Sequence, residues 1–310
     1  MDKKQSIASM EKSHPVDFTL FGSMGAVSAH LSEALISGFN GRRFEFMDVG
    51  EFQAMAHSGP LSEVNQIYWK EILYRAFWAS AINLMRHQKW QSACVRAFET
   101  PANFLAFAAA LRGLLEGAQD AWYSLGPVLP TLARDRAYIE SAVLGNLRDK
   151  GFVDRELEDR LIHFIYARKI VKTDRGMSPD SHIALEPKDY RNATGLPDDE
   201  RKAWTQLYDD LCGICHPTAF SLIAGWKDEN GVVQIGQSDD SSQILALCRK
   251  YDAIISTAFS LSVTTSAMNL KALNWFSLPE TKCADVTDWN FESIPAWREA
   301  HTALSKQIVH

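Results

Sequence analysis

Apolar residues recur at spacings of three and four over most of this chain, and this period restricts its fold more than any other feature. Between residues 62 and 87, the pairs Ile67-Tyr68, Ile72-Leu73 and Phe77-Trp78 fall on one face of a helix. The sequence therefore predicts a mainly α protein, an up-and-down bundle of about five or six helices. The expected helices cover residues 62–87, 91–98, 102–125, 131–149, 154–172, 198–216 and 241–275.

One segment departs from the helical period. Asn230-Gly231 is the strongest turn signal in the chain, and apolar runs lie on both sides of it, at 220–226 and 232–236. A short turn of this type between two apolar runs is typical of a β-hairpin. We therefore expect one small β-hairpin near residues 220–236, inserted before the last long helix.

Glycine and proline divide the chain into three parts. Residues 1–58 are interrupted by glycines and predict a loosely structured leader, with some helix at 29–39 and short strands at 43–49. Residues 59–276 form the expected helical bundle domain, and residues 277–310 form a tail with one short helix at 296–308. Within the bundle, a polar loop at 173–197 is long enough to be either functional or mobile.

The composition is that of a soluble globular protein, with 46% hydrophobic and 23% charged residues. A net charge of -6 argues against a basic surface for non-specific nucleic-acid binding. Five scattered cysteines are typical of reduced thiols, and the charged leader is a poor signal peptide, so we expect a cytoplasmic protein. Residues 253–270 carry no charge, but seven Ser or Thr among them favour a buried helix over a membrane span.

The stretch from Leu207 to Thr218 gathers the rarest side chains of the chain. Cys212-Gly-Ile-Cys215-His216 matches the attachment motif of c-type haem, in which two thiols bind the haem vinyl groups and the histidine binds iron. A redox pair is a second interpretation, although the thiols stand at the end of a helix, where its dipole does not favour a thiolate. A zinc site needs a further pair of ligands, and no second Cys or His pair has the required spacing. We therefore expect no metal and no cofactor.

His216 is the stronger candidate in this stretch. Pro217 disfavours helical geometry at His216, which places the imidazole at the helix end. Asp209 and Cys212 share its face at spacings of three and four, with Tyr208 beside them. A histidine in this place acts as acid, base or phosphate contact, or simply caps the helix by binding a carbonyl.

A second group of polar residues lies on the helix at 102–125. Arg112 and Glu116 are one turn apart, and Asp120 follows one turn later, on a face that begins apolar and becomes charged. Such a face either leads into a pocket or is an ordinary solvated surface. Arg75, within an aromatic-rich helix, is a further candidate, although such an arginine often extends to solvent. The candidate catalytic residues are therefore His216, Arg112, Glu116 and Tyr208, and the candidate binding residues are Asp209, Cys212, Asp120 and Arg75.

Residues 62–275 resemble a loose group of bacterial all-helical proteins with the pattern Tyr-x-x-Leu-Cys-x-x-x-His-Pro, here Tyr208 to Pro217, and an Arg-x-x-x-Glu pair, here Arg112 and Glu116. That group is similar to HEPN-like helical bundles. The resemblance implies ribonucleases of toxin or phage-defence systems, or their non-catalytic relatives. The HEPN ribonuclease motif is an arginine and a histidine on a helix, with four to six residues between them. Its only match, Arg175 to His182, lies in a loop with Gly176 and Pro179.

Three hypotheses follow. The first is a module that binds a protein partner or itself as a dimer, indicated by the nine Trp and sixteen Phe and by the incomplete catalytic motif. The second is a metal-independent ribonuclease, with His216 as acid or base, Arg112 on the phosphate, and RNA as partner. The third is a haem or redox protein using Cys212, Cys215 and His216. The sequence favours the binding module over the enzyme and predicts no membrane contact.

Overall fold

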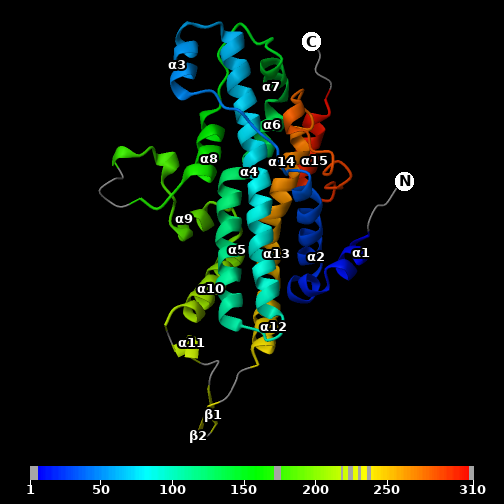
Figure 1. Ribbon diagram of the computed structural model, residues 1–310, viewed down its shortest axis with the longest axis vertical. Helices are drawn as coiled ribbons and strands as arrows, with labels where there is room; N and C mark the ends of the chain where they lie inside the picture. The colour runs from blue at the N-terminus through cyan, green and yellow to red at the C-terminus, as the bar shows by residue number, and fades with distance from the viewer. Residues whose placement is uncertain are drawn as a thin grey trace. The chain divides into compact units, whose positions relative to one another are not determined.

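The computed structural model describes residues 6–170, 176–217, 219–222, 226–229, 232–235 and 239–306 (Figure 1). Most of these residues are helical, which confirms the prediction of a mainly α protein whose helices pack as a bundle. The helices are α1 (Ile7–Ser13), α2 (Pro15–Ser37), α3 (Val49–Ser58), α4 (Leu61–Phe98), α5 (Phe104–Leu125), α6 (Val128–Arg134), α7 (Arg136–Val143), α8 (Arg155–Tyr166), α9 (Pro187–Asn192), α10 (Asp198–Cys215), α11 (Ala219–Leu222), α12 (Asp240–Lys250), α13 (Asp252–Phe259), α14 (Thr265–Leu273) and α15 (Pro295–Leu304).

The contacts of the chain divide it into two compact units, each made of three segments. Unit 1 contains Met1–Glu33, Met85–Asp120 and Pro187–Val263, and unit 2 contains Ala34–Leu84, Ala121–Glu186 and Thr264–His310. This grouping differs from the leader, bundle and tail that glycine and proline suggested. The reason is that local breaks in a sequence do not report which distant segments bury their apolar side chains together.

The core of unit 1 is aromatic. Phe21 of α2 stacks against Phe107 of α5 with ring centroids 6.3 Å apart, and it contacts Phe259 of α13 at 5.2 Å. The ring of His87 lies edge-on to Phe259 at 4.8 Å. Gln91 of α4 donates to the backbone carbonyl of Gly25 at 2.9 Å, which holds α2 against α4. Phe21 and Gly25 of α2, which fall in the expected loose leader, are thus packed into this core.

Unit 2 is built around Trp69 of α4, which is fully buried. Its indole N–H donates to the carbonyl of Phe152 at 2.8 Å, and the two rings stack with centroids 4.9 Å apart. Asn65, one turn earlier, bonds the carbonyls of Leu147 and Lys150 at 3.1 and 2.8 Å. These side chains fix the connection between α7 and α8. Helices α6, α14 and α15 pack together in the same unit.

Several expected boundaries differ from those observed. Helix α4 runs without interruption to Phe98, because Gln91 and Cys94 continue its buried face beyond His87. The region expected as two helices after residue 131 forms α6, α7 and α8. No strand forms at the described residues 43–49. Within the expected loop 173–197, Asp180–His182 forms a 3-10 turn and α9 forms a short helix.

The final helical region is also divided. Tyr251 leaves helical geometry between α12 and α13, and Ser260–Thr264 forms a π-helical turn between α13 and α14. Asp252–Leu273 is the one stretch among the described residues long and apolar enough to cross a membrane, but 72% of its most apolar 18-residue window is buried inside the protein. That burial is typical of the core helix of a soluble protein and agrees with its Ser and Thr content.

Two short strands occupy the region where a hairpin was expected. β1 (Trp226–Glu229) pairs antiparallel with β2 (Val232–Ile235), with Trp226 opposite Ile235 and Glu229 opposite Val232. In Figure 1 both strands extend beyond α11 and α12, which belong to the same unit. The Asn230-Gly231 turn itself lies outside the described residues.

Candidate functional site

The apolar period of α5 and α10 places the candidate residues. On α10, Trp204, Leu207, Leu211 and Ile214 are buried at spacings of three and four, so Tyr208 and Cys212 lie on the flank of the buried face. On α5, Leu111, Leu114 and Leu115 are buried, which leaves Arg112 and Glu116 at its edge. Both helices belong to unit 1 at these positions.

Three predicted residues meet in what we call the Tyr208 cluster, formed by Arg112, Glu116, Tyr208 and Arg191. Arg112 Nε donates to Glu116 Oε1 at 3.0 Å, and Arg112 Nη2 donates to Tyr208 Oη at 3.0 Å. The Tyr208 hydroxyl donates to Glu116 Oε1 at 2.9 Å. The guanidinium carbons of Arg112 and Arg191 lie 5.1 and 5.6 Å from the centre of the Tyr208 ring.

The surroundings of Tyr208 and Arg112 determine the protonation of both side chains at neutral pH. Burial and the hydrogen bond to Glu116 raise the pKa of Tyr208 to about 12. Burial alone would lower the pKa of Arg112, but the hydrogen bond and charge of Glu116, together with Tyr208 and Cys212, outweigh burial and raise that pKa. Tyr208 is therefore a neutral phenol and Arg112 a cation at neutral pH. Neither residue is a general base under those conditions.

His216 stands apart from these interactions. It caps α10, and its backbone N–H donates to the carbonyl of Cys212 at 2.9 Å, in agreement with the predicted helix end. Its side chain is exposed. Among the described residues, no hydrogen bond, ion pair or ring contact joins the imidazole to Arg112 or Tyr208. The structure thus joins Arg112 to Tyr208 without adding His216.

The two thiols of the Cys212-x-x-Cys215 motif are free and half-buried. Burial raises the pKa of Cys215, an effect that the charge of Arg112 opposes and the neighbouring Cys212 reinforces. Cys215 is therefore a thiol, not a thiolate, at neutral pH. The part of the chain that the structure describes contains no group of three or more His, Cys, Asp or Glu side chains suited to a metal ion.

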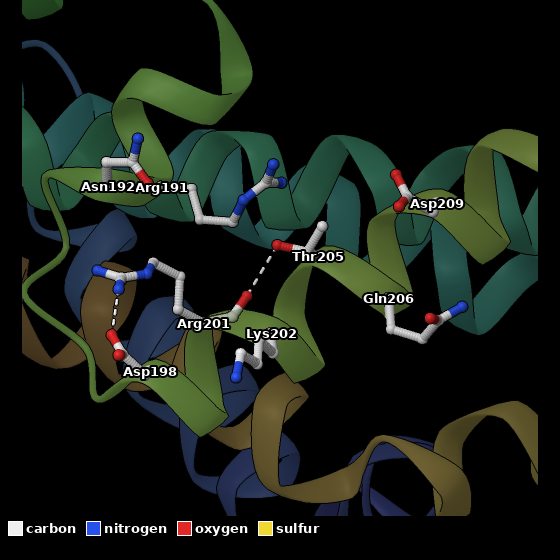
Figure 2. Close-up of a pocket in the computed structure, with 8 residues that line it drawn as sticks. All are labelled: Arg191, Asn192, Asp198, Arg201, Lys202, Thr205, Gln206 and Asp209. Carbon is white, nitrogen blue, oxygen red and sulfur yellow. Dashed lines mark hydrogen bonds and ion pairs between the residues drawn. The ribbon is translucent and has the colours of Figure 1, made fainter.

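Asp209 lies next to the cluster, in an open depression of about 440 Å³ that α9 and residues Asp198 to Asp209 of α10 line (Figure 2). Arg201 in this depression pairs with Asp198, and the Thr205 hydroxyl donates to the Arg201 carbonyl at 2.8 Å. The lining residues are Arg191, Asn192, Asp198, Arg201, Lys202, Thr205, Gln206 and Asp209.

The remaining predicted residues belong to other contacts. Asp120 of α5 accepts from Arg86 Nη1 at 2.5 Å, and Arg86 also bonds the carbonyl of Gly117 at 2.9 Å, so Asp120 ties α5 to α4. Arg75 lies in unit 2, where it pairs with Glu71 at 2.9 Å and covers the ring of Phe46 at 4.9 Å. The charge of Asp120 is therefore balanced by Arg86, and that of Arg75 by Glu71.

Arg191 and Arg86 were not predicted as site residues. Arg191 falls within the expected loop 173–197, where no apolar period indicates which face it takes. Arg86 continues the pattern of a long helix, and only its contact with Asp120 distinguishes it. No local signal in the sequence identifies either residue.

The fold and this cluster define a mainly helical protein with a cationic, tyrosine-centred site. In comparisons with known proteins, no family model matches the chain, and no curated protein or solved structure is significantly similar to it. The site is therefore interpreted from its own chemistry.

Proposed function

We propose that this protein is a non-catalytic module that associates with a second copy of itself through the edge of strand β2. The observation that carries the proposal is the exposure of apolar side chains in one part of unit 1: Leu222 is 65% exposed, Val232 is 67% exposed and Ile235 is 87% exposed. Exposed apolar residues gathered in one segment are typical of an interaction surface.

The strands themselves favour strand pairing between copies. A two-stranded sheet is only marginally stable by itself in water, and additional strands stabilise it. β1 contains Lys227, Asp228 and Glu229, and charged edges of this kind disfavour strand addition. β2, with the sequence Val-Val-Gln-Ile, contains no charge. Two copies of β2 related by a two-fold axis would pair without opposing like charges.

Sedimentation velocity tests the proposal directly. We expect the parent protein to form a dimer at micromolar concentrations, and the Ile235→Lys variant to sediment as a monomer, because the lysine places two like charges at the two-fold pairing. The matched control is Met177→Lys, since Met177 is 81% exposed in unit 2 and should leave the dimer intact. A parent protein that stays monomeric across this range contradicts the proposal.

A metal-independent ribonuclease is the second candidate, and the meeting of Arg112, Glu116 and Tyr208 supports it. In that function Arg112 would contact an RNA phosphate and His216 would transfer the proton. The test is cleavage of a labelled single-stranded RNA in the presence of EDTA by the parent, His216→Ala and the control His57→Ala, an exposed histidine outside both candidate motifs. If His216→Ala cleaves RNA as fast as the parent, this candidate is wrong.

We also propose a cytoplasmic location in a bacterial cell, in a phage-defence or toxin-type system. The free state of all five cysteines supports a reducing compartment. The defence context rests on the resemblance to HEPN-like bundles alone. Expression of the protein and of Ile235→Lys in bacteria, followed by a plaque count, measures whether the protein limits phage growth.

A further inference from the structure

The depression between α9 and α10 contains an arginine, Arg191, with one unused hydrogen-bond donor. Arg191 Nη1 is shielded from solvent and has no hydrogen-bond partner among the described residues. A shielded donor on a charged group is costly to leave unpaired, more so than a neutral one. The ring of Tyr208, 5.6 Å from the guanidinium carbon, supports one face of Arg191 but accepts no such bond from it.

The other cations of the depression differ in whether they already have an ion-pair partner. Arg201 is paired with Asp198, so its charge is compensated. Figure 2 shows Arg201 turned toward Asp198, while Arg191 extends the other way along α10, above Thr205. Lys202 is exposed and has no ion pair among the described residues. Arg191 and Lys202 are thus the two cations of the depression with charge to offer a ligand.

From this geometry we infer that the depression binds a compact oxyanion of the phosphate class, held by Arg191 with Lys202 and the Asn192 amide beside it. A guanidinium offers parallel N–H donors that match two oxygens of a phosphate, and the ammonium of Lys202 adds a second charge. The carboxylate of Asp209 bounds the depression further along α10 and repels an anion that extends past Gln206. A single phosphate group therefore fits better than a chain of them.

The inference is independent of strand pairing, because every residue that it uses lies on α9 or α10. Inorganic phosphate is the probe. We expect phosphate to raise the melting temperature of the full chain by a few degrees relative to sodium chloride of the same ionic strength. Isothermal titration calorimetry then gives the dissociation constant.

Arg191→Gln is the decisive variant. It should weaken phosphate binding at least about tenfold, since it removes the charge-assisted donors. Without phosphate it should melt no lower than the parent, because it also removes an unpaired shielded N–H. The matched control is Lys188→Gln, which removes a charge from the same helix outside the depression and should bind phosphate as the parent does.

Lys202→Gln changes an exposed side chain, so it tests the inference even if Arg191→Gln does not fold. It should weaken phosphate binding several-fold. The inference is overturned if the parent shows no phosphate-dependent shift. It is equally overturned if Arg191→Gln and Lys202→Gln both bind phosphate as tightly as Lys188→Gln, because the anion would then bind elsewhere.

Discussion

Two tyrosines, one in each unit, stand between helices and are bound in opposite ways. Tyr68 of α4 is 6% exposed, and its oxygen lies 3.0 Å from the carbonyl of Asp154 and 3.1 Å from the Asp154 N–H, at the start of α8. A longer contact of 3.3 Å joins it to Glu158 Oε2 of the same helix. Tyr208 of α10 is only half-buried, and its hydroxyl bonds the side chains of Arg112 and Glu116. The first tyrosine is held mainly by the backbone of Asp154, with one longer bond to a carboxylate, and the second only by charged side chains.

This difference indicates a structural role for Tyr68 and a ligand-binding role for the Tyr208 cluster. Backbone partners are fixed by the fold, so the bonds of Tyr68 to Asp154 can do little except hold α8 in place, and its bond to Glu158 joins it to the same helix. Side-chain partners can rotate and exchange, so the Tyr208 cluster can accept a ligand in place of one of its own contacts. The shielded and unpaired Nη1 of Arg191 lies on this second cluster, which is consistent with a site completed by an anion.

The contrast between Tyr68 and Tyr208 assumes that the core of unit 1 is well packed. The pH dependence of stability that His87 causes tests this assumption, and it is the largest effect that we expect. His87 is buried, and burial, with a smaller contribution from Arg86, lowers its pKa to about 3. A histidine of the unfolded chain has a pKa near 6.5, so between about pH 6.5 and pH 3 only the unfolded state takes up the proton. The stabilisation is present above this window and is lost as pH falls through it, by up to about 1.4 kcal/mol per pH unit.

Urea unfolding at pH 7, 5 and 4 measures this loss. The free energy of unfolding of His87→Met should decline less steeply with falling pH than that of the parent, by the slope that corresponds to the uptake of about one proton. His57→Met, an exposed histidine on α3, is the control and should keep the slope of the parent. Equal slopes for parent and His87→Met would mean that His87 is hydrated in the folded state, and that the core of unit 1 is open.

Tyr68→Phe should have the next largest effect. The change leaves the Asp154 N–H without its acceptor in a half-buried place, which costs about 1–3 kcal/mol of unfolding free energy. Tyr138→Phe, an exposed tyrosine of the same unit, should change the stability by less than about 0.5 kcal/mol. A loss at Tyr68 no greater than that at Tyr138 would show that water replaces the missing hydroxyl.

The sequence was sufficient to predict the parts of the Tyr208 cluster that depend on helical period. Arg112 and Glu116 are one turn apart on a helix with a clear apolar face, and the helix carrying Tyr208 ends at His216-Pro217, as α10 does. The helical period did not, however, predict the position of the His216 side chain, on which its proposed role depends. A position at a helix end fixes the backbone of His216 but does not direct its imidazole, and the side chain is exposed.

Other features depend on contacts between distant segments. Phe21 lies in a glycine-interrupted stretch without a helical period, yet it is fully buried against Phe107 and Phe259. Arg191 of α9 joins the cluster only because it reaches the Tyr208 ring of α10, a contact that no local pattern encodes. For the same reason, the division of the chain into two three-segment units was not predictable from glycine and proline.

The Tyr208 cluster itself should show the smallest energetic effect. Tyr208→Phe, Arg112→Gln and the double variant form a thermodynamic cycle, whose coupling energy isolates the bond between the two side chains. We expect a coupling of about 0.5–1 kcal/mol by urea unfolding, because both groups are partly exposed and water competes for them. Tyr208→Phe alone should cost less than Tyr68→Phe.

The same cycle repeated in phosphate distinguishes the two kinds of tyrosine most directly. If the anion bound at Arg191 changes the contacts of the Tyr208 ring, the coupling between Arg112 and Tyr208 changes when phosphate is added, since coupled sites share one free energy. The cost of Tyr68→Phe should stay the same in both buffers. A coupling of zero without phosphate would mean that solvent already separates Arg112 from Tyr208. The contrast with Tyr68 would then rest on burial alone, and not on the charges around Tyr208.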